Sequence, residues 1–147
     1  MAAVRRFALI FGIVFLVVGI AGFIPGLTMP HEHPDVRVTS FLGLELRLFA
    51  VNVLHNIVHL LFGVWGIAAS RSIDGGRVYA KGVAIIYAIL TVMGFITAGN
   101  LYTTFGLIPL YGNDIWLHAL LAIVAAYFGF RSHEADEPSR LASGRHT

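Results

Sequence analysis

Four polar side chains lie within an apolar stretch that carries no formal charge between Arg47 and Arg71. They follow one another at the spacing i, i+3, i+4 and i+7, which places all of them on one face of a helix. A polar side chain at membrane depth is costly, and it normally faces a protein interior or a water-filled cavity. The four residues, which form the chain's first candidate site, are Asn52, His55, Asn56 and His59.

A similar pattern recurs near the C-terminus. LFAVNVLHNIVHLLFG resembles LIPLYGNDIWLHALLA at an offset of 59, and FGIVFLVVGIAGFIPG resembles VAIIYAILTVMGFITAG at an offset of 72. The chain therefore looks internally duplicated. The first alignment matches Asn52 with Tyr111, His55 with Asp114, Asn56 with Ile115, and His59 with His118.

If two helices bring these faces together, three imidazoles and one carboxylate converge. Such a donor set suits Zn²⁺ or another first-row divalent ion. The ligands would then be His55, His59, Asp114 and His118. The pair His59 and His118 could alternatively bind a haem from its two faces. No Glu stands beside either histidine of the His-x-x-x-His pattern to act as a base, so zinc-protease chemistry is not indicated.

The same residues also have a structural interpretation, which we favour. Asn and His side chains hydrogen-bond across membrane helices and hold bundles together. Asn113 followed by Asp114 is typical of a helix start, with a cap and an acid in the first turn. On this interpretation no cofactor is bound, and Tyr111, Asp114 and His118 complete a structural polar cluster with the four residues of the first site.

The composition indicates an integral membrane protein. Of the 147 residues, 57% are hydrophobic and 12% are charged, whereas soluble domains carry about 25% charged residues. The mean hydropathy is +0.79. The basic residues flank apolar segments, where membrane topology explains them, so nucleic acid is not an expected partner. Cysteine is absent, which excludes disulfides and thiolate metal sites.

Four apolar stretches predict four membrane-spanning helices, at about 7–27, 48–70, 78–98 and 113–130. The predicted fold is an all-α four-helix bundle of two repeated hairpins, and each hairpin enters from the same side, which makes a parallel repeat. The transmembrane domain is expected to cover residues 1–131. The polar tail, 132–147, is expected to be disordered and cytoplasmic. Gly22 and Gly26, four residues apart, are expected to face another helix.

The distribution of basic residues predicts the orientation. Of the ten Lys and Arg residues, eight lie near the two termini, in the turn between the second and third apolar stretches, or at the start of the third stretch. The other two, Arg37 and Arg47, lie in the connection between the first and second stretches. Cytoplasmic segments collect Lys and Arg. We therefore expect a multi-pass protein of the bacterial inner membrane with both termini in the cytoplasm.

Three segments carry a resemblance to a known family: FGIVFLVVGIAGFIPGL, VNVLHNIVHLLFGVWGIAA and NDIWLHALLAIVAA. Together they resemble the bacterial family catalogued as domain of unknown function 4383, over nearly the whole chain except the tail. The second half of that family usually reads Asn-x-x-Asp-Asn-x-x-His. Tyr111 and Ile115 stand here where those asparagines would be. The resemblance implies a small four-helix bacterial membrane protein and no particular activity.

We expect a non-enzymatic accessory or scaffold subunit whose buried cluster stabilises the bundle. The alternative is a metal- or haem-binding membrane protein that acts in electron transfer or ion handling. A small transporter or channel is a third interpretation, which would need the chain to oligomerise. The expected partners are the lipid bilayer and either another membrane protein or a second copy of the chain.

Overall fold

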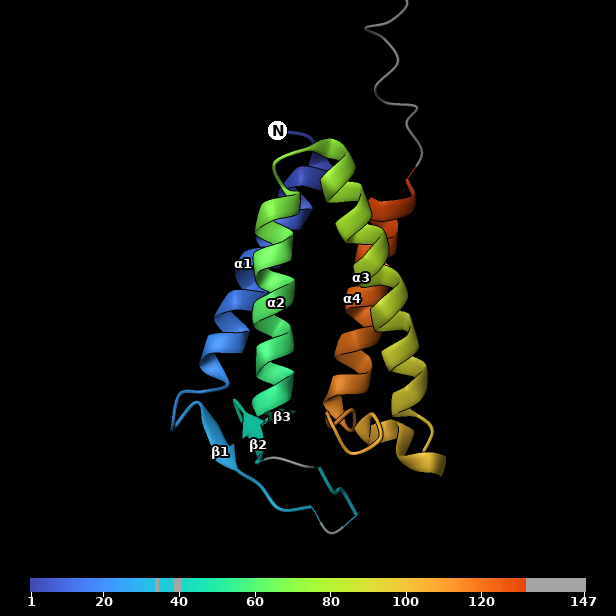
Figure 1. Cartoon of the computed structure of the whole chain (residues 1–147). Coiled ribbons are helices and arrows are strands. Elements are labelled where there is room, and N and C mark those ends of the chain that lie inside the picture. The colour runs from blue at the N-terminus through green and yellow to red at the C-terminus, as the bar shows by residue number, and fades with distance from the viewer. Residues whose placement is uncertain (34, 39–40, 132–147) are drawn as a thin grey trace, which may run out of the picture.

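The computed structural model describes residues 1–33, 35–38 and 41–131. Within these residues the chain forms four α-helices, three short strands and one 3₁₀ helix (Figure 1). In chain order they are α1 (Ala3–Ala21), β1 (Thr28–Pro30), β2 (Leu42–Glu45), β3 (Phe49–Asn52), α2 (Val53–Ala69), α3 (Ile73–Gly94), η1 (Ala98–Thr103) and α4 (Asn113–Phe130).

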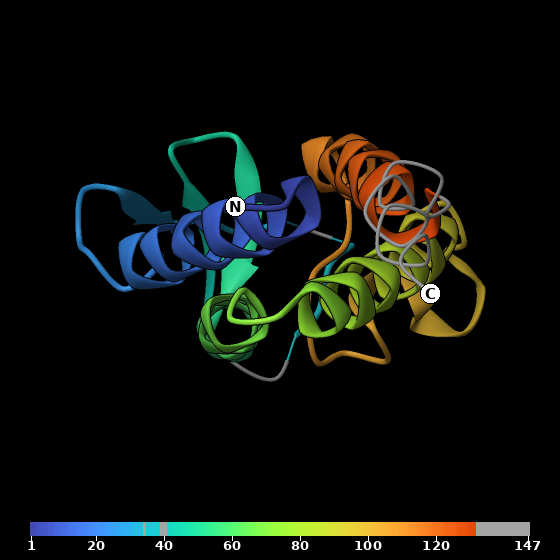
Figure 2. The ribbon, with the colours of Figure 1, turned by 90° about the horizontal axis from the view of Figure 1, so that it is seen from above.

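The helices pair as two antiparallel hairpins, α1 with α2 and α3 with α4, which lie side by side (Figures 1 and 2). Small residues let the backbones approach closely. A Cβ atom added to Gly12 would lie 2.7 Å from the backbone nitrogen of Ile67, and one added to Gly129 would lie 2.8 Å from that of Lys81. Membrane helices commonly pack in this way.

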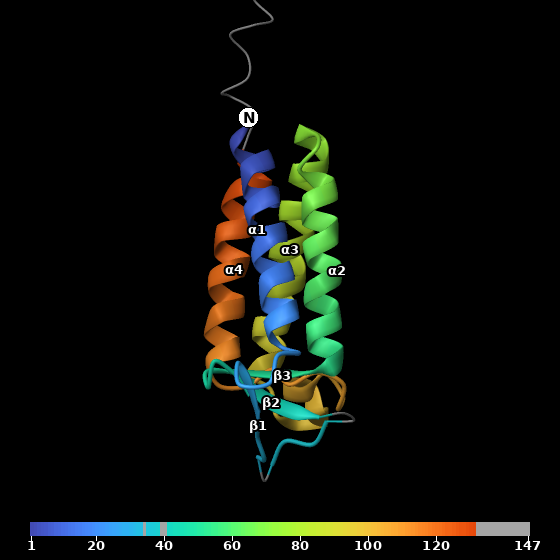
Figure 3. The same cartoon turned by 90° about the vertical axis from the view of Figure 1, so that its left-hand side faces the viewer.

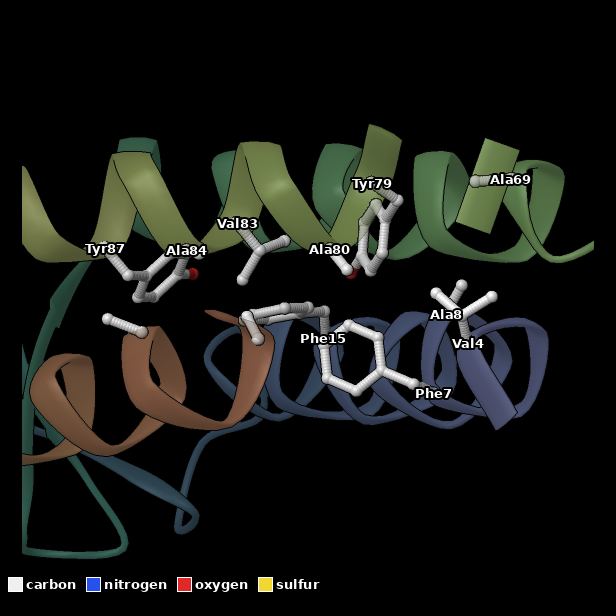
Figure 4. Packing of buried hydrophobic residues seen from close by; sticks show 12 residues of the cluster. Val4, Phe7, Ala8, Phe15, Ala69, Tyr79, Ala80, Val83, Ala84 and Tyr87 are labelled. Carbon is white, nitrogen blue, oxygen red and sulfur yellow. The ribbon is translucent and has the colours of Figure 1, made fainter. Parts of the chain in front are cut away.

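The two hairpins meet along a core of aromatic and small side chains, drawn in Figure 4. Phe7 and Phe15 from α1 contact Tyr79 and Tyr87 from α3, with ring centroids 6.2 Å and 5.7 Å apart respectively. Large apolar side chains on the outer faces of the helices remain exposed, as expected for surfaces that meet lipid.

Three of the described helices, α1, α3 and α4, are long and apolar enough to cross a membrane. The helix α2 has 17 residues and is apolar but shorter. These lengths and compositions indicate a membrane protein. The start of α1, the turn between α2 and α3, and the end of α4 all lie at one end of the bundle, and the strands and η1 lie at the other (Figures 1 and 3).

The prediction of an all-α fold was wrong for the first long connection. There β1, β2 and β3 form an antiparallel sheet in that order, and β2 pairs with β3 from Leu42 opposite Asn52 to Glu45 opposite Phe49. Residues 48–52 were expected to begin the second helix. A short apolar run cannot be assigned to helix or strand by periodicity alone, and the pairing partner at 42–45 decides it here.

The helix bounds also differ from the sequence prediction. The helix α1 covers Ala3–Ala21 rather than 7–27, because the chain turns after Gly22. Gly26 lies in that turn with φ +94°, and a Cβ atom added to it would meet nothing within 4 Å, so the expectation that it faces a helix was wrong. The helix α3 starts at Ile73 rather than near 78, because the Ser72 side chain accepts the Gly75 N–H and caps it. The predicted tail, 132–147, lies outside the described residues.

Candidate functional site

The polar residues singled out from the sequence gather where α2 and α4 begin, next to the sheet. Their side chains are almost completely enclosed, and the largest exposed fraction is 8%, at His59. The rings of His55 and His118, from α2 and α4, lie 6.2 Å apart between centroids. The buried members are Asn52, His55, Asn56, His59, Asp114 and His118.

Part of this cluster binds the backbone of β3. The Ala50 N–H donates to Asp114 Oδ2 at 2.9 Å, and the Ala50 carbonyl lies 3.2 Å from His55 Nδ1. A carbonyl can only accept, so Nδ1 of His55 carries the proton. Asn52 caps α2, because its side chain accepts the His55 N–H at 2.9 Å. These three side chains hold the last strand against two helix N-termini.

The loop before α4 is tied to the same region. Asn52 Nδ2 donates to the Leu107 carbonyl at 2.7 Å, and Asn113 Nδ2 donates to the Leu48 carbonyl at 3.1 Å. Tyr111, which the sequence placed in the cluster, is half-buried, and its ring lies 5.0 Å from that of His33 between centroids. The hydrogen-bonded part of the cluster thus joins the two hairpins at the end of the bundle that carries the sheet.

A second part of the cluster has unused hydrogen-bonding atoms. Among the described residues, Nδ1 of His59, Nδ1 of His118 and Oδ1 of Asn56 are buried and have no hydrogen-bond partner. The His59 ring contacts His55 at 4.4 Å and Phe15 at 5.6 Å, and the His118 ring contacts Tyr87 at 4.9 Å, all between centroids. An unpaired buried polar atom costs about 1–3 kcal/mol.

A cavity of about 300 Å³ opens beside these histidines, between α1 and α4. Its walls are mainly apolar, and its polar residues are Glu45, His59, Asp114 and His118. The lining from α1 is Ile10, Phe11, Val14, Phe15 and Val18; that from β2, β3 and the turn between them is Glu45, Leu46, Phe49 and Val51; α2 adds His59, and α4 adds Asp114, Leu117, His118 and Leu121.

Glu45 is the site residue that the sequence analysis missed. It ends β2, its side chain is buried, and its Oε2 has no partner among the described residues. Burial raises the pKa of this carboxyl to about 7. One signal was available: Glu45 is the only acidic residue between Asp35 and Asp74. Its burial depends on strand pairing, which the sequence pattern did not predict.

The described geometry does not favour the metal alternative. Within residues 1–33, 35–38 and 41–131, no group of three or more His, Asp or Glu side chains is arranged to hold a metal ion. A haem between His59 and His118 would need a flat slot between the two imidazoles, and the His55 ring lies beside both. Both alternatives stay predictions, which elemental analysis and an absorption spectrum of the purified protein would test.

The fold and the cluster together define a small helical membrane protein with a buried polar cluster at the end of the bundle that carries the sheet, and with a cavity beside that cluster. The family model described as "Domain of unknown function (DUF4383)" matches residues 5–131. The chain therefore belongs to this family, as its sequence segments indicated. No curated protein and no solved structure matches the chain.

Proposed function

We propose that this chain is a non-enzymatic membrane protein that binds a lipid-soluble small molecule in the cavity between α1 and α4. One observation carries the proposal. Three buried residues from three separate elements, Glu45, His59 and His118, line the same mainly apolar cavity. Ligand sites in proteins are mainly apolar pockets of this kind with a few convergent polar groups.

An internal repeat explains why this cavity is open. We propose that α1 and α3 correspond at an offset of 72, and α2 and α4 at an offset of 59. Both aromatic contacts between α1 and α3 then join equivalent residues, Phe7 with Tyr79 and Phe15 with Tyr87. If a twofold axis relates the two hairpins, each residue that lies near the axis contacts its own equivalent in the other hairpin.

Contacts within the hairpins agree with this register. A Cβ atom at Gly22 would meet the Asn56 side chain, and one at Gly94 would meet the side chain of Ile115. These two pairs are equivalent under the same offsets.

The repeat relates the cleft between α1 and α4 to the cleft between α2 and α3. In the second cleft Phe62 packs against Tyr87, with ring centroids 5.7 Å apart, and the Trp65 ring lies against Tyr79 and Gly82. The equivalents of Phe62 and Trp65 in α4 are Leu121 and Val124. Aliphatic side chains therefore stand where aromatic rings fill the other cleft, and this loss of volume leaves room for a ligand.

The charges around the cavity limit the ligand. Two carboxyl groups, Glu45 and Asp114, line it, and its lining includes no Lys or Arg. An anionic group bound there would have no cation among the lining residues to compensate its charge. The ligand's polar end is therefore neutral or cationic.

The proposal includes an accessory role in the bacterial inner membrane, with both termini in the cytoplasm. Arg5 and Arg6 precede the apolar part of α1, and Arg71 and Arg77 flank the turn into α3, which supports this orientation. The cavity then lies toward the outer face of the membrane. The protein would hold its ligand there, and another membrane protein would use it.

Native mass spectrometry of the protein released from mild detergent tests the proposal. We expect a co-purified small molecule of defined mass on the wild-type chain, recovered chemically unchanged after incubation. Leu121→Phe fills the cavity and should remove that mass. Leu120→Phe is the matched control, because Leu120 is exposed on the outer surface of α4. Equal ligand content in all three proteins, or none in the wild type, would overturn the proposal.

A further inference from the structure

We propose that the open groove between the start of α1 and the end of α4 binds an anionic phospholipid. One acyl chain lies in the groove, and the phosphate of the headgroup contacts Arg6. This site lies toward the end of the bundle opposite the sheet. It is distinct from the cavity beside the histidines, although Ile10 and Phe11 border both, and it does not depend on what that cavity binds.

The groove combines an apolar floor with a basic residue. Its volume is about 370 Å³. Phe7 and Phe128 stack in it with ring centroids 4.8 Å apart, and exposed Arg6 belongs to its lining in the first turn of α1. Near the end of a membrane helix, an arginine lies at headgroup level and its neighbours one or two turns deeper meet acyl chains. The apolar lining consists mainly of Phe7, Ile10, Phe11, Val124 and Phe128.

No carboxylate among the described residues compensates the charge of Arg6. Its Nε donates to the Met1 carbonyl at 3.0 Å, and it forms no ion pair within this part of the chain. Asp74, in the first turn of α3, pairs instead with Arg77 at 3.9 Å. Arg131 follows Phe128 by three residues, so a second guanidinium stands at the same end of the groove. Guanidinium groups bind phosphate oxygens through paired hydrogen bonds.

The first turn of α1 adds to the positive potential. It contains no acidic residue, and Ala2, which precedes the helix, offers no side-chain acceptor for the free N–H groups. Such a helix start carries a partial positive charge and favours an anion. A zwitterionic headgroup would bring its ammonium group to the same arginines, so a lipid with net negative charge is preferred.

The cleft between α2 and α3 shows what fills this space elsewhere in the chain. Under the repeat proposed above, Val124 corresponds to Trp65 and Phe7 to Tyr79. The Trp65 ring packs against Tyr79 with ring centroids 4.9 Å apart. The groove is therefore the space that a tryptophan occupies in the equivalent cleft.

The basic residues follow the same asymmetry. Arg6 corresponds to Val78 and Arg131 to Ser72, so the filled cleft has no cation at either position. A topology signal alone does not require arginines to border the open cleft rather than the filled one. Open apolar space and positive charge occur together at the groove, as a lipid with an anionic head requires.

Native mass spectrometry of the full chain tests the proposal, with release from micelles that contain equal amounts of phosphatidylglycerol and phosphatidylcholine of identical acyl chains. We expect one phosphatidylglycerol per chain, favoured by about fivefold, the factor expected for one arginine beside an anionic lipid. Glycerol phosphate lacks the acyl chains and myristate lacks the phosphate, so each should bind more weakly than phosphatidylglycerol.

Variants with matched controls separate the headgroup from the chain. Arg6→Gln should abolish the preference for phosphatidylglycerol, whereas Arg71→Gln, an equal change of charge at an exposed position in the other hairpin turn, should keep it. Val124→Trp fills the groove and should remove the bound lipid. Ile123→Trp, on the exposed face of α4, should leave it in place.

Each part of the proposal has a result that would overturn it. Equal binding of the two phospholipids, or equal effects of Arg6→Gln and Arg71→Gln, would overturn the anionic headgroup. Binding of myristate or glycerol phosphate as tight as that of phosphatidylglycerol would overturn a phospholipid. Lipid retained by a folded Val124→Trp would overturn the groove; if this variant fails to fold, the two arginine variants still decide. Leu121 lines the internal cavity and not the groove, so Leu121→Phe should leave the phospholipid bound, and the two proposals fail separately.

Discussion

The hydrogen bond between Asp114 and Ala50 provides a direct test of how the three-stranded sheet is held to the bundle. Asp114→Ala removes the acceptor of the Ala50 N–H, and both residues are only 2% exposed. Water cannot readily replace the lost partner. Leaving a buried donor unpaired costs about 1–3 kcal/mol in water-referenced proteins. Hydrogen bonds between membrane helices average only about 0.6 kcal/mol, because the unfolded state in lipid finds other partners.

The cost of about 1–3 kcal/mol applies to the Ala50 N–H, because β3 lies outside the spanning helices and its unfolded form is solvated by water. We therefore expect Asp114→Ala to lower the free energy of unfolding by about 1–3 kcal/mol. Asp114→Asn keeps an oxygen that can accept the N–H, so it should cost less than half as much.

Unfolding in mixed micelles with increasing dodecyl sulfate, followed by tryptophan fluorescence, measures both values. Ile123→Ala on the exposed face of the same helix is the control. A stability of Asp114→Ala within about 0.5 kcal/mol of the wild type, below the cost expected for the orphaned donor, would refute the reasoning. An equal loss in Asp114→Asn would show that charge, rather than the hydrogen bond, matters.

Three further predictions follow from single positions. Gly22→Leu should destabilise the protein by about 1–3 kcal/mol through overpacking, because a side chain there meets Asn56; an unchanged melting temperature would contradict this. Burial raises the pKa of Glu45 to about 7, so the folded state favours its protonated form. Its contribution to stability is present at low pH and is lost as the pH rises through about 7. The difference between wild type and Glu45→Gln, measured from pH 5 to 8, should show this loss, and a pH-independent difference would argue against it. Finally, an impermeant thiol reagent applied to intact cells should label His31→Cys and not Ser139→Cys; external labelling of the latter would reverse the orientation.

The membrane class and much of the helical pattern could be predicted from the sequence. Apolar runs of the right length are a local property, and lipid leaves the backbone little alternative to helix. The prediction for the last helix, 113–130, agrees with α4, because Gly112 and Asn113 mark its start and Arg131 follows its end. The spacing of His55 and His59 likewise indicated a shared helical face, since helical periodicity is also local.

The sheet, the cavity and the roles within the polar cluster were decided only by tertiary structure. Residues 48–52 are apolar enough for a helix, and only pairing with 42–45 makes them a strand. That pairing buries Glu45 and brings the Ala50 N–H to Asp114, 64 positions away. Sequence spacing could not show that the Asp114 carboxylate is hydrogen-bonded while Nδ1 of His118 has no partner among the described residues. The partner of a buried polar atom is set by long-range contacts. The cavity is lined by Leu121 of α4 together with residues of α1, and a packing defect exists only once the helices are assembled.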